Sequence, residues 1–178
     1  MVSNCRVYLS RIILILLICF IAACSSQLST STQPNTTLPI TDSADLNIVT
    51  GQVVFVPAYS QVTFPVNGST NRLAVTLAIH NTDLEHPIVI QSVRYYDTEG
   101  SLVREFVESP AILNAMATTG FVVDGREADV GWGANFVVEW VAEQPVYEPV
   151  IEALMYSDGG LEGYSFISTG RIISEQMP

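Results

Sequence analysis

The chain has 178 residues, 48% of them hydrophobic, and carries 18 acidic side chains against 7 basic ones, all arginine. Its formal charge of −11 argues against a nucleic-acid binder, because such proteins need a basic footprint. The lack of lysine excludes Schiff-base chemistry.

Residues 1–23 have the pattern of a secretory signal peptide. Two arginines precede the apolar run Ile12–Ala23, which is shorter than the roughly 20 residues that span a bilayer. The run ends in Ile21-Ala22-Ala23-Cys24, the order of a lipobox. We therefore expect cleavage before Cys24 and acylation of its sulfur. The alternatives are an ordinary signal peptide that contains a cysteine and an uncleaved anchor.

Lipidation at Cys24 would attach the protein to a membrane of the cell envelope. The next residue is Ser25, whereas Asp in that place tends to hold lipoproteins at the inner membrane, so we expect the outer membrane, facing the periplasm. Cys5 and Cys19 leave with the signal peptide, and the lipid uses the remaining sulfur, so neither a disulfide nor a thiolate nucleophile is expected. The mature chain keeps 5 arginines and 18 acids, a charge of −13. This charge favours cations or a basic partner and also keeps a protein soluble.

Residues 24–47 are predicted to be the lipidated cysteine and a flexible linker. Ser, Thr, Gln, Asn and Pro dominate this segment, and such a composition buries too little apolar surface to offset the entropy of ordering.

Residues 48–174 are predicted to form one all-β domain. Arg72–Ile79 and Asn135–Val141 alternate apolar and polar side chains, the period of a strand with one buried face, and Trp140 is a predicted core residue. Further strands are expected at Gln52–Val56, Ile112–Leu113, Gly120–Asp124, Val150–Tyr156 and Tyr164–Ile173, with a β-hairpin over Ile88–Val107. We predict an antiparallel, immunoglobulin-like β-sandwich. A small barrel is the alternative, and the Cys-Trp-Cys pattern of true immunoglobulin domains is missing.

Several segments resemble one bacterial lipoprotein family. They are Gly51–Ser60, Leu73–Leu77 with Asn81-Thr82-Asp83, Ser92–Asp97 and Gly133–Phe136. The chain resembles the family catalogued as domain of unknown function 3124, over about residues 50 to 173. This resemblance implies an envelope lipoprotein and brings neither an activity nor catalytic residues.

The usual enzymatic sequence motifs are missing, including G-x-S-x-G, H-E-x-x-H, a Gly-rich phosphate loop and C-x-x-C. His80 and His86 flank a turn near Asp83, and a cryptic hydrolase that uses His80 and Asp83 is one hypothesis. The spacing of the two histidines matches no recognised metal-ligand pattern, so structural roles are the simpler interpretation. We expect no cofactor and no metal.

The candidate binding surface comprises Asp124, Glu127, Asp129 and Trp132, which crowd one loop. Its carboxylates could hold Ca²⁺, although their spacing is not that of an EF-hand. Trp132 lies between two glycines and could stack on a sugar or anchor a protein partner, or fold back over the end of the sandwich. The leading hypothesis is therefore a non-enzymatic interaction domain of an envelope lipoprotein, and the alternative is an acidic cation- or glycan-binding module.

Overall fold

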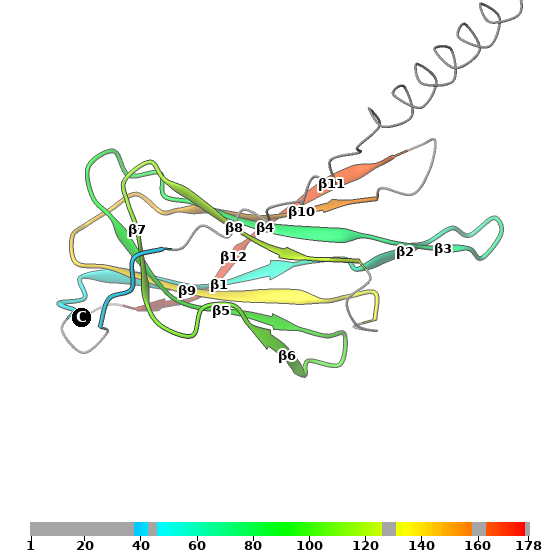
Figure 1. Ribbon diagram of the computed structural model, residues 1–178, viewed down its shortest axis with the longest axis horizontal. Helices are drawn as coiled ribbons and strands as arrows, with labels where there is room; N and C mark the ends of the chain where they lie inside the picture. The colour runs from blue at the N-terminus through cyan, green and yellow to red at the C-terminus, as the bar shows by residue number, and fades with distance from the viewer. Residues whose placement is uncertain (1–37, 43–45, 126–130, 158–162, 177–178) are drawn as a thin grey trace, which may run out of the picture. The chain divides into compact units, whose positions relative to one another are not determined.

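Figure 1 shows the computed structural model, which describes residues 38–42, 46–125, 131–157 and 163–176. All of them belong to the compact unit Pro34–Pro178. Cys24 and the predicted signal peptide lie outside the described residues.

The described strands form two large antiparallel sheets and one small hairpin. The first sheet has the order β12-β1-β9-β5-β6, with β7 also paired to β5. Its strands are β1 (Thr50–Pro57), β5 (Ile88–Tyr96), β6 (Leu102–Glu105), β7 (Ala111–Leu113), β9 (Asn135–Ala142) and β12 (Arg171–Gln176). The second sheet has the order β11-β10-β4-β8. Its strands are β4 (Ala74–His80), β8 (Thr118–Val123), β10 (Val150–Tyr156) and β11 (Ser165–Thr169), and β2 (Gln61–Thr63) pairs with β3 (Thr70–Arg72).

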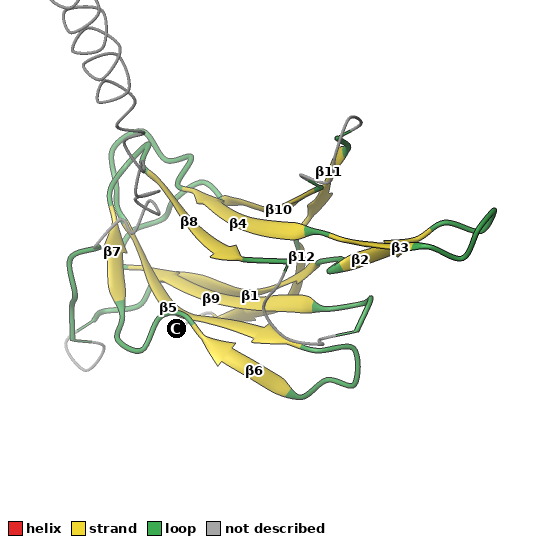
Figure 2. Cartoon of the chain, turned by 45° about the vertical axis from the view of Figure 1, so that its right-hand side comes forward, coloured by secondary structure: helices red, strands yellow, loops and turns green. Residues whose placement is uncertain are grey.

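The two sheets face each other as separate layers around one core (Figure 2). Alternate residues of β4 and β9 are buried, as the period of two predicted. Trp140 is 1% exposed and is among the largest buried side chains, which confirms its predicted place in the core. The all-β antiparallel sandwich is confirmed. The barrel alternative is wrong, because in the described part of the chain neither sheet closes on itself.

The predicted hairpin over residues 88–107 is confirmed by the antiparallel pairing of β5 with β6. Its turn is closed by a hydrogen bond from the Gly100 N–H to the Asp97 carbonyl, at 3.1 Å. Gly100 has φ +84°, a conformation that costs glycine little. The register of the pair shifts between Tyr95 and Tyr96, as expected where a bulge follows such a turn.

The C-terminal segment differs from the prediction of one strand over Tyr164–Ile173. The chain leaves β11 of the second sheet at Gly170 and continues as β12 of the first. A Cβ atom at Gly170 would lie 2.7 Å from Val54 Cγ1 and 2.8 Å from the Ile151 carbonyl oxygen. The crossing between the two layers therefore needs a residue without a side chain.

The described residues 38–42 lie against the first sheet. Ile40 forms an antiparallel bridge with Ala111, the Thr41 N–H donates to the Pro110 carbonyl at 2.9 Å, and Leu38 packs against the core. This part of the predicted linker therefore extends the edge at β7, beside which residues 38–42 run (Figure 1).

Candidate functional site

The two described members of the candidate binding surface, Asp124 and Trp132, lie at the end of the sandwich opposite β7. Asp124 directly follows β8, and Trp132 lies just before β9. Glu127 and Asp129 fall in residues 126–130, outside the described residues. The structure thus places Trp132 and Asp124 at one end of the fold, and it leaves the predicted carboxylate cluster untested.

The backbone on both sides of Trp132 is fixed by hydrogen bonds from distant loops. The Ser60 hydroxyl donates to the Gly131 carbonyl, and the Gly133 N–H donates to Thr98 Oγ1 at 3.0 Å. Gly131 has φ +74°, and a Cβ there would collide with Thr98. The Trp132 side chain remains 61% exposed. An exposed indole therefore stands on a backbone that several contacts hold in place.

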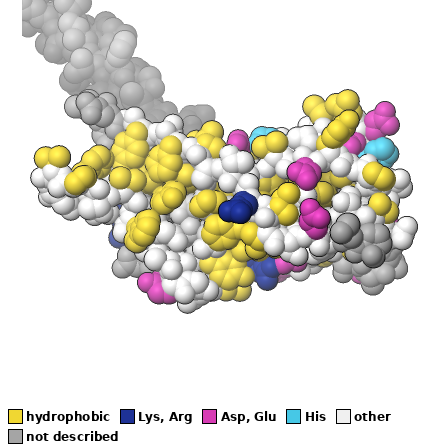
Figure 3. Space-filling view, turned by 180° about the vertical axis from the view of Figure 1, so that it is seen from behind, with side chains coloured by type: hydrophobic (Ala, Val, Ile, Leu, Met, Phe, Trp, Pro, Cys, Tyr) yellow, Lys and Arg dark blue, Asp and Glu magenta, His cyan; other side chains and the backbone are white. Residues whose placement is uncertain are grey.

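Trp132 belongs to a larger group of aromatic side chains. Its ring stacks on Tyr59, with centroids 6.2 Å apart and 25° between the planes, and Tyr59 lies 6.0 Å from Phe166. Phe64 meets Tyr164 edge to face at 6.1 Å. We name these residues the aromatic surface: Tyr59, Phe64, Trp132, Tyr164 and Phe166. Trp132 and Phe64 are its exposed members, and the other three are partly buried against the core beneath them. Seen from behind, apolar side chains cover much of the half of the molecule that carries the β2–β3 hairpin (Figure 3).

Sequence reasoning found one member of the aromatic surface, Trp132, through its flanking glycines. It missed Tyr59 and Phe64, which flank β2, and it assigned Phe166 only to a strand. A sequence signal existed in the Tyr164-Ser165-Phe166 spacing, because residues two apart on a strand share a face. The contact between that face and Tyr59 depends on the fold.

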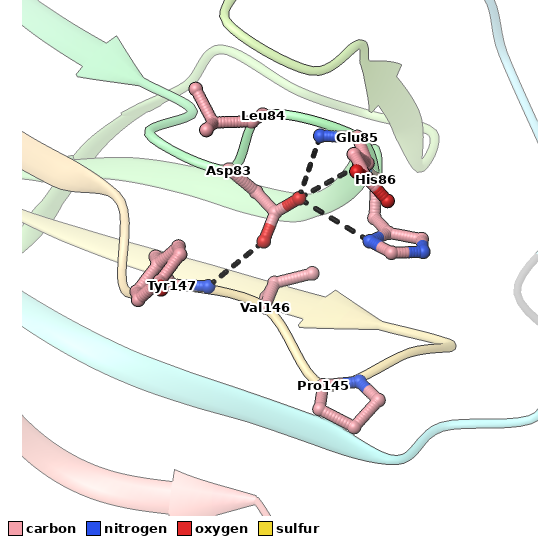
Figure 4. A pocket seen from close by; sticks show the side chains of 7 residues that line it. All are labelled: Asp83, Leu84, Glu85, His86, Pro145, Val146 and Tyr147. Atoms are coloured by element: carbon pink, nitrogen blue, oxygen red, sulfur yellow. Dashed lines mark hydrogen bonds and ion pairs between the residues drawn. The ribbon is translucent and has the colours of Figure 1, made fainter.

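At the opposite end, near β7, the Asp83 carboxylate joins two loops (Figure 4). Oδ1 accepts the backbone N–H groups of Glu85 at 3.0 Å and His86 at 2.8 Å, and Oδ2 accepts the Tyr147 N–H at 3.2 Å. The His86 ring Nδ1 lies 3.3 Å from Oδ1. These contacts, led by the Glu85 and His86 N–H groups, lower the pKa of Asp83 from 3.8 to about 2.

An open pocket of about 490 Å³ lies beside this carboxylate, lined by Asp83–His86 and Pro145–Tyr147. Its two large apolar side chains are highly exposed: Leu84 is 71% and Tyr147 72% accessible. The oxygens of Asp83 are used by the loops themselves, so this residue positions the walls of the pocket.

The hydrogen bonds of His80 and Asp83 run to different partners. His80 Nδ1 lies 2.9 Å from Thr118 Oγ1, its cross-strand neighbour on β8, whereas the imidazole beside Asp83 is that of His86. The hydrolase hypothesis pairs His80 with Asp83, whereas the described hydrogen bonds pair His80 with Thr118 and Asp83 with His86. Within the described ranges, no group of three His, Cys, Asp or Glu side chains could hold a metal.

In the part of the chain that the structure describes, no helix is long and apolar enough to cross a bilayer.

These features define a two-sheet β-sandwich with a fixed aromatic surface at one end and an open pocket at the other. A family model described as "Protein of unknown function (DUF3124)" matches residues 51–173. The chain belongs to this family, which confirms the resemblance seen in the sequence.

Among solved structures, the crystal structure of Thermotoga maritima 1070 aligns at 12% sequence identity and a TM-score of 0.38. The alignment covers 71% of this chain and 96% of that chain. A score of this size does not define a shared fold. No curated protein matches the chain.

Proposed function

We propose that this protein is a lipoprotein of the bacterial cell envelope whose β-sandwich is a non-enzymatic interaction domain. It is held through lipid on Cys24 to the outer membrane, facing the periplasm, and it binds an envelope protein through the aromatic surface. The observation that carries the binding part is the exposed Trp132, stacked on Tyr59 and held by backbone contacts on both sides.

The geometry suits binding because little ordering remains to be done when a partner arrives. Trp and Tyr supply large contact areas and dominate the hot spots of protein interfaces. The Gly133 N–H bond to Thr98 and the Ser60 bond to Gly131 already restrict the backbone of Trp132. Binding then costs less conformational entropy than it would for a mobile loop.

The anchoring part of the proposal rests on the signal-peptide pattern and the lipobox before Cys24. The first described residue, Leu38, follows Cys24 by 14 positions. A segment of that length spans at most about 50 Å when fully extended, so the covalent chain keeps the sandwich close to the lipid. More than one acyl chain is needed for lasting attachment, and a diacylglyceryl thioether would supply two.

The proposal is tested with the full-length protein purified from its host envelope. Mass spectrometry should find an acylated Cys24 as the first residue, and a Cys24→Ser variant should leave the membrane fraction. Pull-down should recover one envelope protein with the native chain and with Cys24→Ser released from the membrane. An unmodified N-terminus that precedes Cys24 would contradict the anchor.

The contribution of the aromatic surface is tested by a Trp132→Ala variant. Truncation of a hot-spot residue costs about 2 kcal/mol or more, close to a 30-fold loss of affinity. The control is Leu154→Ala, which removes an apolar side chain 37% exposed on β10. Recovery of the partner should fall with Trp132→Ala and stay unchanged with the control.

A second candidate function is an acidic module that binds a cation or a glycan. The flat Trp132–Tyr59 stack favours the glycan form, because the apolar face of a sugar ring packs on aromatic side chains. Calorimetry with Ca²⁺ and with cell-wall glycan fragments tests it. Heat of binding that disappears with Trp132→Ala would support the glycan form, and heat with Ca²⁺ alone would support a site at the carboxylates.

A further inference from the structure

The loops near β7 present large apolar side chains to solvent. We name as proximal loops the segments 81–87, 113–117 and 143–149. Their most exposed apolar residues are Leu84 at 71%, Met116 at 63% and Tyr147 at 72%, and Ile40 beside them is 73% exposed. Each comes from a different connection of the chain, so the apolar character of this end is assembled by the fold.

The proximal loops are tied into one frame by two buried polar residues. The Asp83 carbonyl accepts the Met116 N–H at 3.1 Å, and its carboxylate accepts the Tyr147 N–H at 3.2 Å. The Asn81 side chain donates to the carbonyls of Leu113 and Asn114 at 3.2 and 3.1 Å. These bonds fix the relative positions of the loop backbones that carry the three exposed side chains.

The backbone conformation of Met116 also indicates that its surroundings hold this frame in place. It has φ +59°, a left-handed conformation that costs a residue with a Cβ of order 1 kcal/mol or more and persists only where the surroundings impose it. The Met116 N–H bond to Asp83 and the Ala117 N–H bond to Asn114, each 3.1 Å, impose it here.

Residues 38–42 pair with the segment around the start of β7 at this same end. Thr41 bonds to Pro110, just before β7, and Leu38 lies 14 positions after Cys24. If lipid holds Cys24, as the proposed function requires, Leu38 lies no more than about 50 Å from the lipidated residue, which is the fully extended length of the chain between them. The β2–β3 hairpin, beside which Tyr59 and Phe64 of the aromatic surface lie in sequence, is at the other end of the sandwich from β7 (Figure 2).

We propose that the proximal loops dock on the bilayer, with Leu84, Met116 and Tyr147 inserted at its interface. This inference rests on the lipid anchor of the proposed function. Tyr suits the interface because its ring is apolar and its hydroxyl is polar. Apolar side chains of peripheral proteins enter by about 5–10 Å.

The negative charge of this end determines which lipid head groups it can approach. Carboxylates border the apolar tips at Asp42, Glu85, Glu143 and Glu148, and they repel anionic head groups. The lipid is therefore zwitterionic, and an increase in anionic lipid should weaken the contact. Docking in this orientation turns the aromatic surface away from the membrane, toward a partner.

The test uses the full-length lipidated protein in phosphatidylcholine vesicles. Its mature chain has one cysteine, whose sulfur carries the lipid, so Leu84→Cys, Met116→Cys and Val66→Cys each provide one free thiol for a fluorophore. Val66 is 98% exposed and lies in the β2–β3 hairpin, at the opposite end. Labels at 84 and 116 should be several-fold less accessible to iodide than the label at 66, and lipid-borne quenchers should reach only those two.

The outcomes separate this inference from the anchor on which it rests. Protein that floats with the vesicles but shows equal iodide quenching at all three positions would overturn docking and leave the anchor intact. Protein that does not float would overturn both. Shielding that occurs in native envelope membranes but not in vesicles would assign the proximal loops to a protein partner and also overturn docking on lipid. A double Leu84→Ser, Met116→Ser variant with a label at Tyr147→Cys should lose its shielding while still floating.

Discussion

The Asp83 carboxylate accepts the backbone N–H of Tyr147 at 3.2 Å, across 64 positions of sequence. The same residue accepts the Met116 N–H through its carbonyl. One side chain in a turn thus fixes how two other loops approach it, and it decides how Leu84 and Tyr147 are presented. The acid that sequence reasoning considered for catalysis organises this end of the sandwich.

Replacement of Asp83 by alanine should lower the melting temperature, because the N–H groups of Glu85, His86 and Tyr147 lose their acceptor. Thermal unfolding followed by circular dichroism measures the change. Glu99→Ala, in the exposed β5–β6 turn, is the matched control and should leave the melting temperature unchanged. Equal melting temperatures for all three proteins would contradict the role assigned to Asp83.

Stability should also depend on pH through this residue. The pKa of Asp83 is lowered from 3.8 to about 2 on folding, so the unfolded chain takes up the proton at a higher pH than the folded chain does. The stabilisation is complete above about pH 4 and is lost as the pH falls through 3.8 toward 2. Urea unfolding at pH 5, 3 and 2 should show a smaller decline for Asp83→Asn than for the native protein. Parallel declines would contradict the prediction.

The crossing between the sheets should not tolerate a side chain at Gly170. Alanine there would place its Cβ 2.7 Å from Val54 Cγ1 and 2.8 Å from the Ile151 carbonyl oxygen. Such overpacking costs about 1–3 kcal/mol, measurable by denaturant unfolding. Gly133→Ala is the control, since its nearest neighbour would be Thr98 Oγ1 at 4.0 Å. A native-like free energy of unfolding for Gly170→Ala would show that the crossing is more adaptable than the structure indicates.

The two tryptophans should be distinguishable by fluorescence. Trp140 is 1% exposed and Trp132 is 61% exposed, so acrylamide should quench one population readily and the other poorly. A Trp132→Phe variant should retain only the blue-shifted, protected emission of Trp140. Readily quenched emission in that variant would contradict the burial of Trp140.

Local patterns predicted most of the strands but missed the short β2 and β3, and features that depend on long-range contacts were not predictable from those patterns. The alternation in β4 and β9 is a property of neighbouring residues, so it is visible in the sequence. The sheet change at Gly170 depends on Val54 and Ile151, which only the fold brings there. The same limit explains why one strand was expected where β11 and β12 occur.

In the candidate site, individual residues could be recognised from the sequence, but their contact partners could not. Trp132 stood out between two glycines, but its neighbour Tyr59 follows β1 and gives no local sign of the stacking. His80 was considered with Asp83 because they are close in sequence, whereas the pairing of β4 with β8 places Thr118 beside His80. The partners of Trp132 and of His80 are therefore determined by contacts between segments that are distant in the sequence, and sequence spacing does not encode such contacts.

Binding of an envelope protein by the aromatic surface can be tested by photo-crosslinking in living cells. A photoreactive amino acid would replace Trp132 in the full-length protein, and a second variant would carry it at Leu154 as the control. We expect one discrete crosslinked protein from position 132 and none from position 154. Equal crosslinking from the two positions, or none from either, would contradict it.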